Sequence, residues 1–309
     1  MNIKGMILLL IMLLPSQAAI AQPVSMAEVG RKLFFDPNLS EPPGQSCASC
    51  HVSTAGFADP DREIPVSRGI HPDRFGPRNT PSIAYSMFSP PLYYDKAEQH
   101  YVGGQFYDGR AKTLEDQAKE PFLDPVEMAN PDSAAVVRKV RAADYADEFL
   151  QVFGKDGLAD TDKAFNNIAM AIAAFERTPA FRPFTSKYDY YLAGKVALTE
   201  SEMRGLKLFE AEDKGNCVAC HPSQADDKGN PPLFTDYTYD NLGLPANEKN
   251  PFYVQSAEFN PEGKNYVDIG LAATTGRDED RGKFKLTTLR NIALTAPYFH
   301  NCIVSSLTE

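Results

Sequence analysis

The sequence contains two copies of the motif Cys-x-x-Cys-His, at residues 47–51 and 217–221. This spacing is the signature of covalent c-type haem attachment, in which two thiols add to the vinyl groups of one haem and the adjacent imidazole ligates the iron. Zinc knuckles and disulfides also use Cys-x-x-Cys, but neither explains a histidine directly after the second cysteine in both copies. Two motifs therefore predict two covalently bound haems. The predicted attachment and proximal ligand residues are Cys47, Cys50, His51, Cys217, Cys220 and His221.

The N-terminus has the pattern of a secretory signal. Lys4 precedes an apolar run over residues 6–14, and Ala19-Ile20-Ala21 then forms a small-x-small cleavage site. An uncleaved membrane anchor is the alternative, but the run is much shorter than the ~20 apolar residues that span a bilayer. We therefore expect residues 1–21 to be a signal peptide and the protein to be periplasmic, with no membrane span after cleavage.

Residues 30–34 (GRKLF) and 205–209 (GLKLF) lie upstream of the two motifs and resemble each other, which indicates an internal repeat. The length also suits two domains better than one small haem domain. The sequence thus predicts a mainly α fold of two cytochrome c-like domains with long ordered loops. The expected N-terminal domain covers residues 22–185 and the C-terminal domain residues 186–309.

Helical periodicity is strongest between the two motifs. Residues 133–153 and 161–177 are predicted to be core helices, and prolines 179 and 183 break the pattern at the domain boundary. Thr199 and Glu202 fit a capping box at the start of the second repeat helix. Residues 60–91 and 226–261 lack periodicity, and we expect them to be ordered loops over the haem edges.

The formal net charge of −10 excludes nucleic acid and an anionic membrane surface as partners. The acidic surface is consistent either with attraction of a basic redox protein or simply with solubility. Four cysteines are used by the two motifs, so Cys302 is left over. Its role is open between a buried, a reactive and an incidental thiol.

Five further segments, taken together in their order along the chain, resemble the bacterial dihaem cytochrome c peroxidases. The resemblance covers nearly the whole chain after residue 21. It implies that the first haem is a low-potential site where hydrogen peroxide reacts and the second a high-potential electron relay. It also implies a small cytochrome c or cupredoxin as electron donor, and often a homodimer. The segments are Gly76–Pro81, Phe106–Arg110, Thr113–Ala118, Pro125–Met128 and Leu289–His300.

The resemblance also implies roles for single residues of the peroxide site. His71 matches the displaceable distal histidine of the first haem, whose release would open the iron to peroxide. Glu127 matches the acid/base that moves protons during cleavage of the peroxide bond, which a partly desolvated carboxylate can do. Gln117 matches an amide beside the same pocket, and Phe106 an apolar wall.

A calcium ion between the domains is a further implication of the resemblance. Asn79, Thr295 and Pro297 match positions that offer oxygen ligands to this ion. Neutral oxygen donors, partly from backbone carbonyls, suit a hard cation.

The chain departs from the family pattern at three places. Tyr107 stands where the family usually has a tryptophan between the haems, and Cys302 replaces a glycine at an expected turn. The distal methionine of the second haem lies beyond the position of Glu309 in the family, and no methionine follows Met203 here. We therefore expect the sixth position of that haem to be open, water-bound or filled by another residue.

Two alternative functions remain. The related methylamine-utilisation dihaem enzymes oxidise residues of a partner protein; that group lacks the distal histidine, so His71 argues against it. A non-enzymatic electron carrier would show two low-spin, six-coordinate haems in every redox state and would not consume peroxide.

Overall fold

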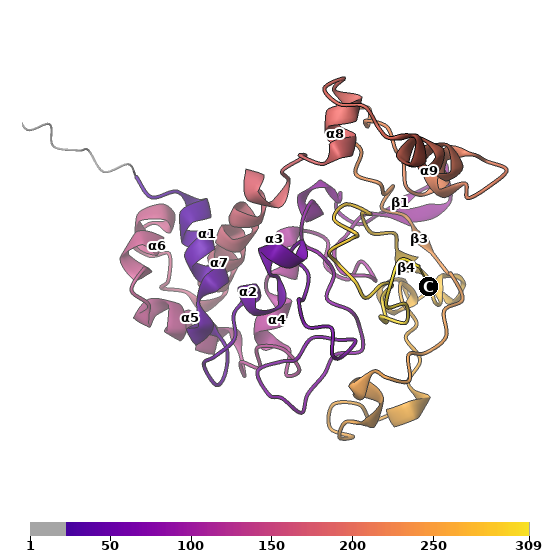
Figure 1. Cartoon of the computed structure of the whole chain (residues 1–309). Helices are drawn as coiled ribbons and strands as arrows, with labels where there is room; N and C mark the ends of the chain where they lie inside the picture. The colour runs from indigo at the N-terminus through magenta and orange to yellow at the C-terminus, as the bar shows by residue number, and fades with distance from the viewer. Residues whose placement is uncertain (1–22, 309) are drawn as a thin grey trace, which may run out of the picture.

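The computed structural model describes residues 23–308, so the predicted signal peptide lies outside the described residues. Within this range the protein is mostly helical with two short two-stranded sheets and long irregular segments (Figure 1), as expected for a mainly α fold. No helix between residues 23 and 308 is both long and apolar enough to cross a membrane. The α-helices are α1 Met26–Phe35, α2 Cys47–Cys50, α3 Leu114–Gln117, α4 Glu120–Leu123, α5 Ser133–Ala142, α6 Ala146–Phe153, α7 Thr161–Glu176, α8 Lys187–Leu192, α9 Glu200–Glu210 and α10 Ala272–Thr275. The strands are β1 Tyr93–Asp95, β2 His100–Val102, β3 Tyr239–Asp240 and β4 Phe284–Lys285.

The core of the first half is built around the crossing of α1 and α7. A capping box at Ser25 starts α1, whose apolar face buries Leu33 and Phe34. At the crossing point the helices touch through Gly30, where an added Cβ would lie 1.8 Å from the carbonyl oxygen of Ala171. Only glycine permits this approach. The main apolar cluster draws its buried members from between residues 29 and 181, and α2 with the first haem motif packs beside it.

The predicted helix over residues 133–153 is two helices, α5 and α6, whereas α7 forms as expected. The chain leaves the helical conformation at Ala143 and resumes it after Tyr145. This break places the Tyr145 hydroxyl where it donates to Asp36 at 2.6 Å, in a buried position. The break carries no proline or glycine, and the periodicity on both sides hides it.

The second repeat helix, α9, begins at the predicted capping box of Thr199 and Glu202. Its surroundings differ from those of α1, because no residue of α9 is buried and the side chain of Leu208 is 55% exposed. The corresponding Leu33 of α1 is 1% exposed. The two repeats therefore share position and helical structure but not packing. The boundary at residue 185/186 stays a prediction.

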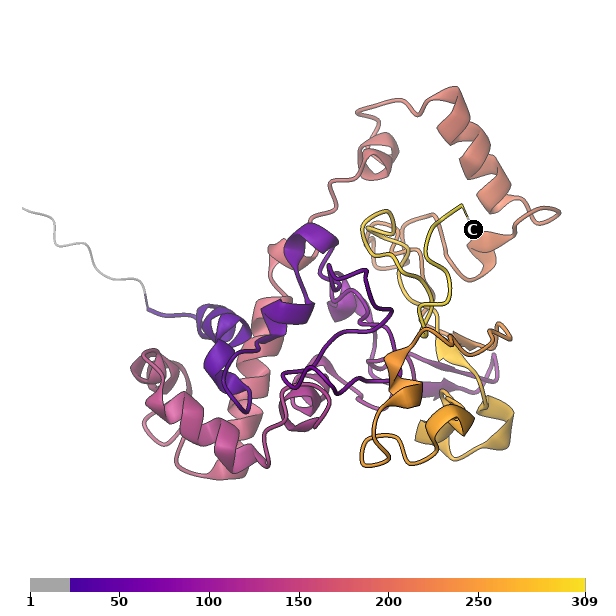
Figure 2. The same ribbon diagram turned by 60° about the horizontal axis from the view of Figure 1, so that its bottom comes forward.

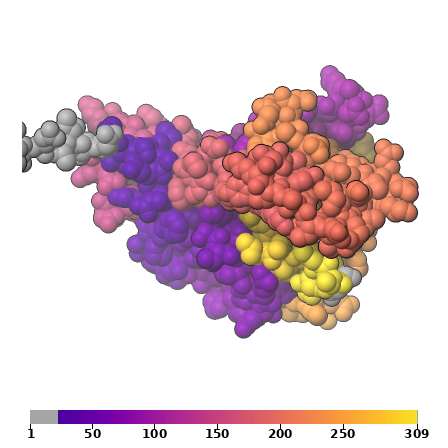
Figure 3. All heavy atoms as spheres, turned by 45° about the horizontal axis from the view of Figure 1, so that its top comes forward, coloured from indigo at the N-terminus to yellow at the C-terminus, as the bar shows by residue number. Residues whose placement is uncertain are grey.

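The two halves of the chain are joined by specific polar contacts. The Tyr239 hydroxyl of β3 donates to the carbonyl of Gly103 at 2.6 Å, next to the β1–β2 hairpin. Arg78 donates to Asp268 at 2.6 Å and to Asp108 at 2.6 Å. The C-terminal segment, yellow in Figures 2 and 3, lies between the purple loops of the first half and the orange segments of the second.

Candidate functional site

Each haem motif borders a cavity. The first cavity, of about 540 Å³, is lined by Cys50 and His51, and the second, of about 810 Å³, by His221. The two cavities share one wall, made by residues from segments 77–82 and 285–288 together with Tyr107 and Tyr266.

In both motifs the Nδ1 atom of the histidine lies next to a backbone carbonyl oxygen. His51 Nδ1 lies 3.0 Å from the carbonyl oxygen of Phe57, and His221 Nδ1 lies 2.6 Å from that of Phe234. A backbone carbonyl at Nδ1 fixes the ring and leaves Nε2 to bind a metal. Burial lowers the pKa of His51, which favours the neutral form that acts as a ligand. The arrangement fits an imidazole-ligated haem at each motif.

The motif cysteines are free thiols, so disulfides do not explain their spacing. Within residues 23–308 no group of three or more His, Cys, Asp or Glu side chains is placed to hold a metal ion. Both alternatives to haem attachment therefore lack support.

The structure brings three of the four predicted residues of the peroxide site to the first cavity: Glu127, Gln117 and Phe106 all line it together with His51. The pKa of Glu127 rises to about 7, chiefly because of burial, and the nearby Asp124 adds to this while Arg110 opposes it. Arg110 lies over the Phe106 ring at 3.5 Å. A carboxyl that is half-protonated near neutral pH can both accept and return a proton.

His71 lies at the tip of a loop closed by an antiparallel bridge between Arg68 and Phe75. The loop borders the first cavity through Gly69 and Gly76, and the amide of the neighbouring Ile70 donates to the Glu127 carbonyl at 2.8 Å. His71 itself is not among the residues that line the cavity. Its role as a distal ligand remains a prediction.

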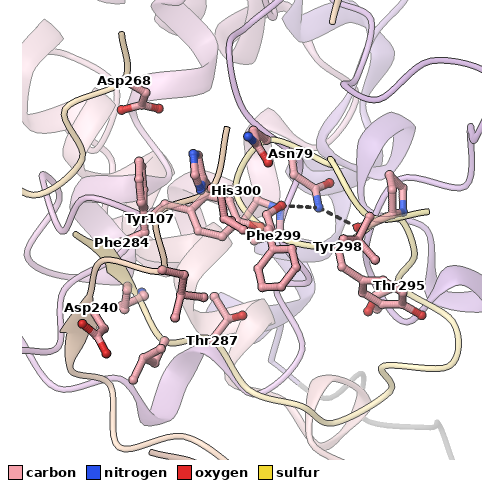
Figure 4. Close-up of a pocket in the computed structure, with 18 of the residues that line it drawn as sticks. Asn79, Tyr107, Asp240, Asp268, Phe284, Thr287, Thr295, Tyr298, Phe299 and His300 are labelled. Carbon is pink, nitrogen blue, oxygen red and sulfur yellow. Dashed lines mark hydrogen bonds between the residues drawn. The ribbon is translucent and has the colours of Figure 1, made fainter. Parts of the chain in front are cut away.

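The three predicted calcium ligands meet on the wall of the second cavity. The Asn79 side-chain amide donates to the carbonyl of Pro297 at 2.9 Å and to that of Phe299 at 3.2 Å, and Thr295 lies nearby (Figure 4). The Asn79 side chain of the first half therefore meets two carbonyl oxygens of the second half through its amide nitrogen. Whether calcium binds here remains a prediction.

Tyr107, at the usual tryptophan position, belongs to the shared wall. Burial raises its pKa, and so does the nearby Cys302. Cys302 is buried and has φ of 59°, in the left-handed region that glycine tolerates best. The turn expected at the missing glycine is therefore present, but a cysteine occupies it.

The structure adds residues that the sequence did not single out. Lys285 belongs to the shared wall, and the His300 ring stacks on Phe284 with the ring centroids 3.5 Å apart in the second cavity (Figure 4). His300 was part of a matched segment without a role of its own. Lysines are ordinarily exposed, so no local signal distinguished Lys285.

Two haem motifs, each with a histidine fixed for metal binding beside its own cavity, define a dihaem c-type cytochrome. The chain belongs to the di-haem cytochrome c peroxidase family, whose model matches residues 24–197.

The chain is 40% identical over 290 residues to the methylamine utilization protein MauG of Paracoccus denitrificans, covering 92% of this chain and 72% of MauG. It is 36% identical over 291 residues to the cytochrome c551 peroxidase of Pseudomonas aeruginosa, covering 93% and 71%. The crystal structure of the diheme peroxidase BthA from Burkholderia thailandensis superposes with a TM-score of 0.81 at 35% identity, covering 94% and 71%. The family thus includes both peroxidases and MauG-type oxidoreductases.

Proposed function

We propose that the protein is a periplasmic dihaem peroxidase that reduces hydrogen peroxide to water. The observation that carries this proposal is the first cavity, where Glu127, with its pKa near 7, and Gln117 line the same space as His51. The reaction consumes one peroxide, two protons and two electrons and yields two waters. Bound haem would supply the iron that accepts the peroxide and the electrons that reduce it.

In this proposal the chain's own residues hold the haems and move protons. The thioether bonds form at Cys47 and Cys50 for the first haem and at Cys217 and Cys220 for the second. The carboxylate of Glu127 would accept a proton from one oxygen of peroxide and return it to the other, which leaves as water. Gln117 donates a hydrogen bond to peroxide or water, and Phe106 with Arg110 closes the cavity wall. The loop that carries His71 regulates access.

A small cytochrome c or cupredoxin would supply the electrons, and Tyr107 in the shared wall would fill the space between the two haem sites. Asn79, Thr295 and Pro297 hold calcium between the halves. We also propose that residues 1–21 are a cleaved signal peptide, that the protein is located in the periplasm and that it forms a homodimer. The calcium part is supported by the position of Asn79 next to the Pro297 carbonyl oxygen across the two halves; calcium would require the Asn79 amide to turn its oxygen, in place of its nitrogen, toward the ion.

The test is a spectroscopic titration of the haem-loaded protein. Visible and electron paramagnetic resonance spectra are recorded for the fully oxidised and half-reduced forms, with and without hydrogen peroxide. We expect a low-spin first haem that becomes high-spin on half-reduction, with peroxide consumed only then and steadily when a reduced cytochrome c is supplied. Two unchanging low-spin haems and no peroxide consumption would instead show an electron carrier.

A MauG-type oxidation of a partner protein is the second candidate. Two observations favour it: the 40% identity to MauG, and the absence of His71 from the residues that line the first cavity. This candidate predicts a first haem that is high-spin and reacts with peroxide already in the fully oxidised form. The same titration therefore separates the two candidates.

A further inference from the structure

Lys285 lies in the wall between the two cavities. It is the last residue of β4, and its amide donates to the carbonyl of Tyr107 at 2.8 Å. The ammonium group donates to the Gly104 carbonyl at 2.7 Å. Because Lys285 lines both cavities, its side chain borders the space assigned to the haems.

Every other arginine or lysine that lines either cavity already has a carboxylate partner. Arg68 pairs with Asp61 at 3.5 Å, and Arg78 bridges Asp108 and Asp268. Arg110 pairs with Glu120 at 2.7 Å and Arg290 with Asp189 at 2.8 Å. These four guanidinium groups are neutralised by the protein itself.

Lys285 alone among these cations forms no ion pair within the described part of the chain. The acid whose charge acts on Lys285 is Asp108, which is already paired with Arg78 and Arg110. Burial consequently lowers the pKa of Lys285 to about 7. A buried ammonium without a counter-charge is costly, and a carboxylate brought by a ligand would relieve that cost.

We propose that Lys285 binds a haem propionate. Each haem carries two propionate carboxylates. A propionate that enters either cavity meets the shared wall, where Lys285 is the cation without a carboxylate partner among the described residues. The backbone bonds of Tyr107 and Gly104 hold the lysine in place before the haem arrives. This inference rests on the proposed haem attachment at the two motifs. It assigns Lys285 as a cofactor-binding residue that also sets the charge between the haems.

The test compares holoprotein carrying Lys285→Met, which removes the charge at nearly constant volume, with Lys285→Arg, which keeps it. Lys283→Met is the matched control, because Lys283 lies two residues away, pairs with Asp280 at 3.0 Å and lines neither cavity. Haem content is measured by the pyridine haemochrome assay. Redox titration gives the midpoint potential of each haem, and resonance Raman spectra report the propionate bending modes.

We expect Lys285→Met to lower the midpoint potential of one haem and to shift one propionate mode, because a positive charge next to that haem disfavours its oxidised form. The haem whose potential moves identifies the cavity. Lys285→Arg should restore both readouts, and Lys283→Met should match the wild type. Two haems with unchanged potentials and Raman modes in Lys285→Met would overturn the inference.

Wild-type spectra keep the inference testable if Lys285→Met fails to fold. In that case one propionate mode of the wild-type protein must have the frequency of an ion-paired carboxylate. Modes that all match water-exposed propionates would contradict the assignment. A wild-type protein without two haems would instead contradict the proposed function itself.

Discussion

At the scale of single residues, the first cavity is lined both by Glu127, a carboxyl with a pKa of about 7, and by the motif histidine His51. Glu127 is held by the backbone on both sides, because its amide donates to Asp124 and its carbonyl accepts from Ile70. Its carboxyl is thereby kept in a partly enclosed place, where burial raises the pKa. The position of the backbone, more than any ion pair, prepares this residue for acid/base work.

Replacing Glu127 with glutamine should lower peroxide turnover about 10²- to 10⁴-fold, the usual contribution of a general acid/base. Haem content should not change. In the wild type the base form is populated above the pKa of about 7, so turnover should rise as the pH increases through about 7. The measurement is steady-state peroxide consumption from pH 5 to 9. Glu98→Gln, at an exposed turn, serves as control; equal losses in both variants would contradict the assignment.

The resemblance to the dihaem peroxidases predicted roles for Glu127, Gln117 and Phe106, and all three line the first cavity, while their roles stay predictions. The sequence did not predict Lys285, because that position depends on the pairing of β4 with β3 and on the contact with Tyr107, which lies far away in the sequence. His71 illustrates the opposite limit. The spacing of His71 from the matched segment predicted a loop that borders the first cavity. Spacing alone cannot specify whether the imidazole of His71 points toward the cavity or away from it.

At the scale of elements, the repeat helices α1 and α9 have similar sequences but different surroundings. Sequence identified both helices and their positions upstream of the motifs, because capping and periodicity are local. It could not reveal that α1 packs closely on α7 while α9 stays exposed, since packing depends on distant partners. The break between α5 and α6 was missed for the same reason.

The glycines of the two repeats provide a matched pair of substitutions. Gly30→Ala places a methyl group against the Ala171 carbonyl and should destabilise the protein by at least about 3 kcal/mol. Gly205→Ala meets nothing within 4 Å and should stabilise α9 by about 0.5–1 kcal/mol. Thermal unfolding of the two variants measures both effects. A Gly30→Ala protein as stable as the wild type would show that the α1–α7 crossing is looser than described.

The last residue of α7, Glu176, is a buried acid with one side-chain oxygen that has no hydrogen-bond partner. Burial raises its pKa to about 8, so its contribution to stability is complete below about pH 4.5 and is lost as the pH rises through about 8. Glu176→Gln should therefore match the wild type at pH 4 and exceed its stability at pH 9 by a few kcal/mol, on the order of 1.4 per unit of pKa shift. Unfolding midpoints at the two pH values test this. The exposed Glu200→Gln should show no such difference.

At the scale of the whole molecule, the shared wall joins the two haem cavities through Tyr107. Tyr107→Ala should slow electron transfer from the second haem to the first and should cost on the order of 3 kcal/mol of stability. Tyr107→Phe should keep the rate if the ring alone fills the path, which we expect because burial keeps the hydroxyl protonated. Stopped-flow reduction, followed at each haem's own absorption bands, measures the rate. A slow Tyr107→Phe variant would instead assign a redox role to the hydroxyl.

The shared wall also has a consequence for how the protein is made. The first cavity is lined by residues from both halves of the chain, including Tyr237, Tyr266 and Thr288 of the second half. During synthesis the motif at residues 47–51 is therefore made long before the residues that complete the lining of the first cavity. The lining of the first cavity is complete only after Thr288 has been made, so a fragment ending at residue 185 would carry the first attachment motif without the whole of its cavity.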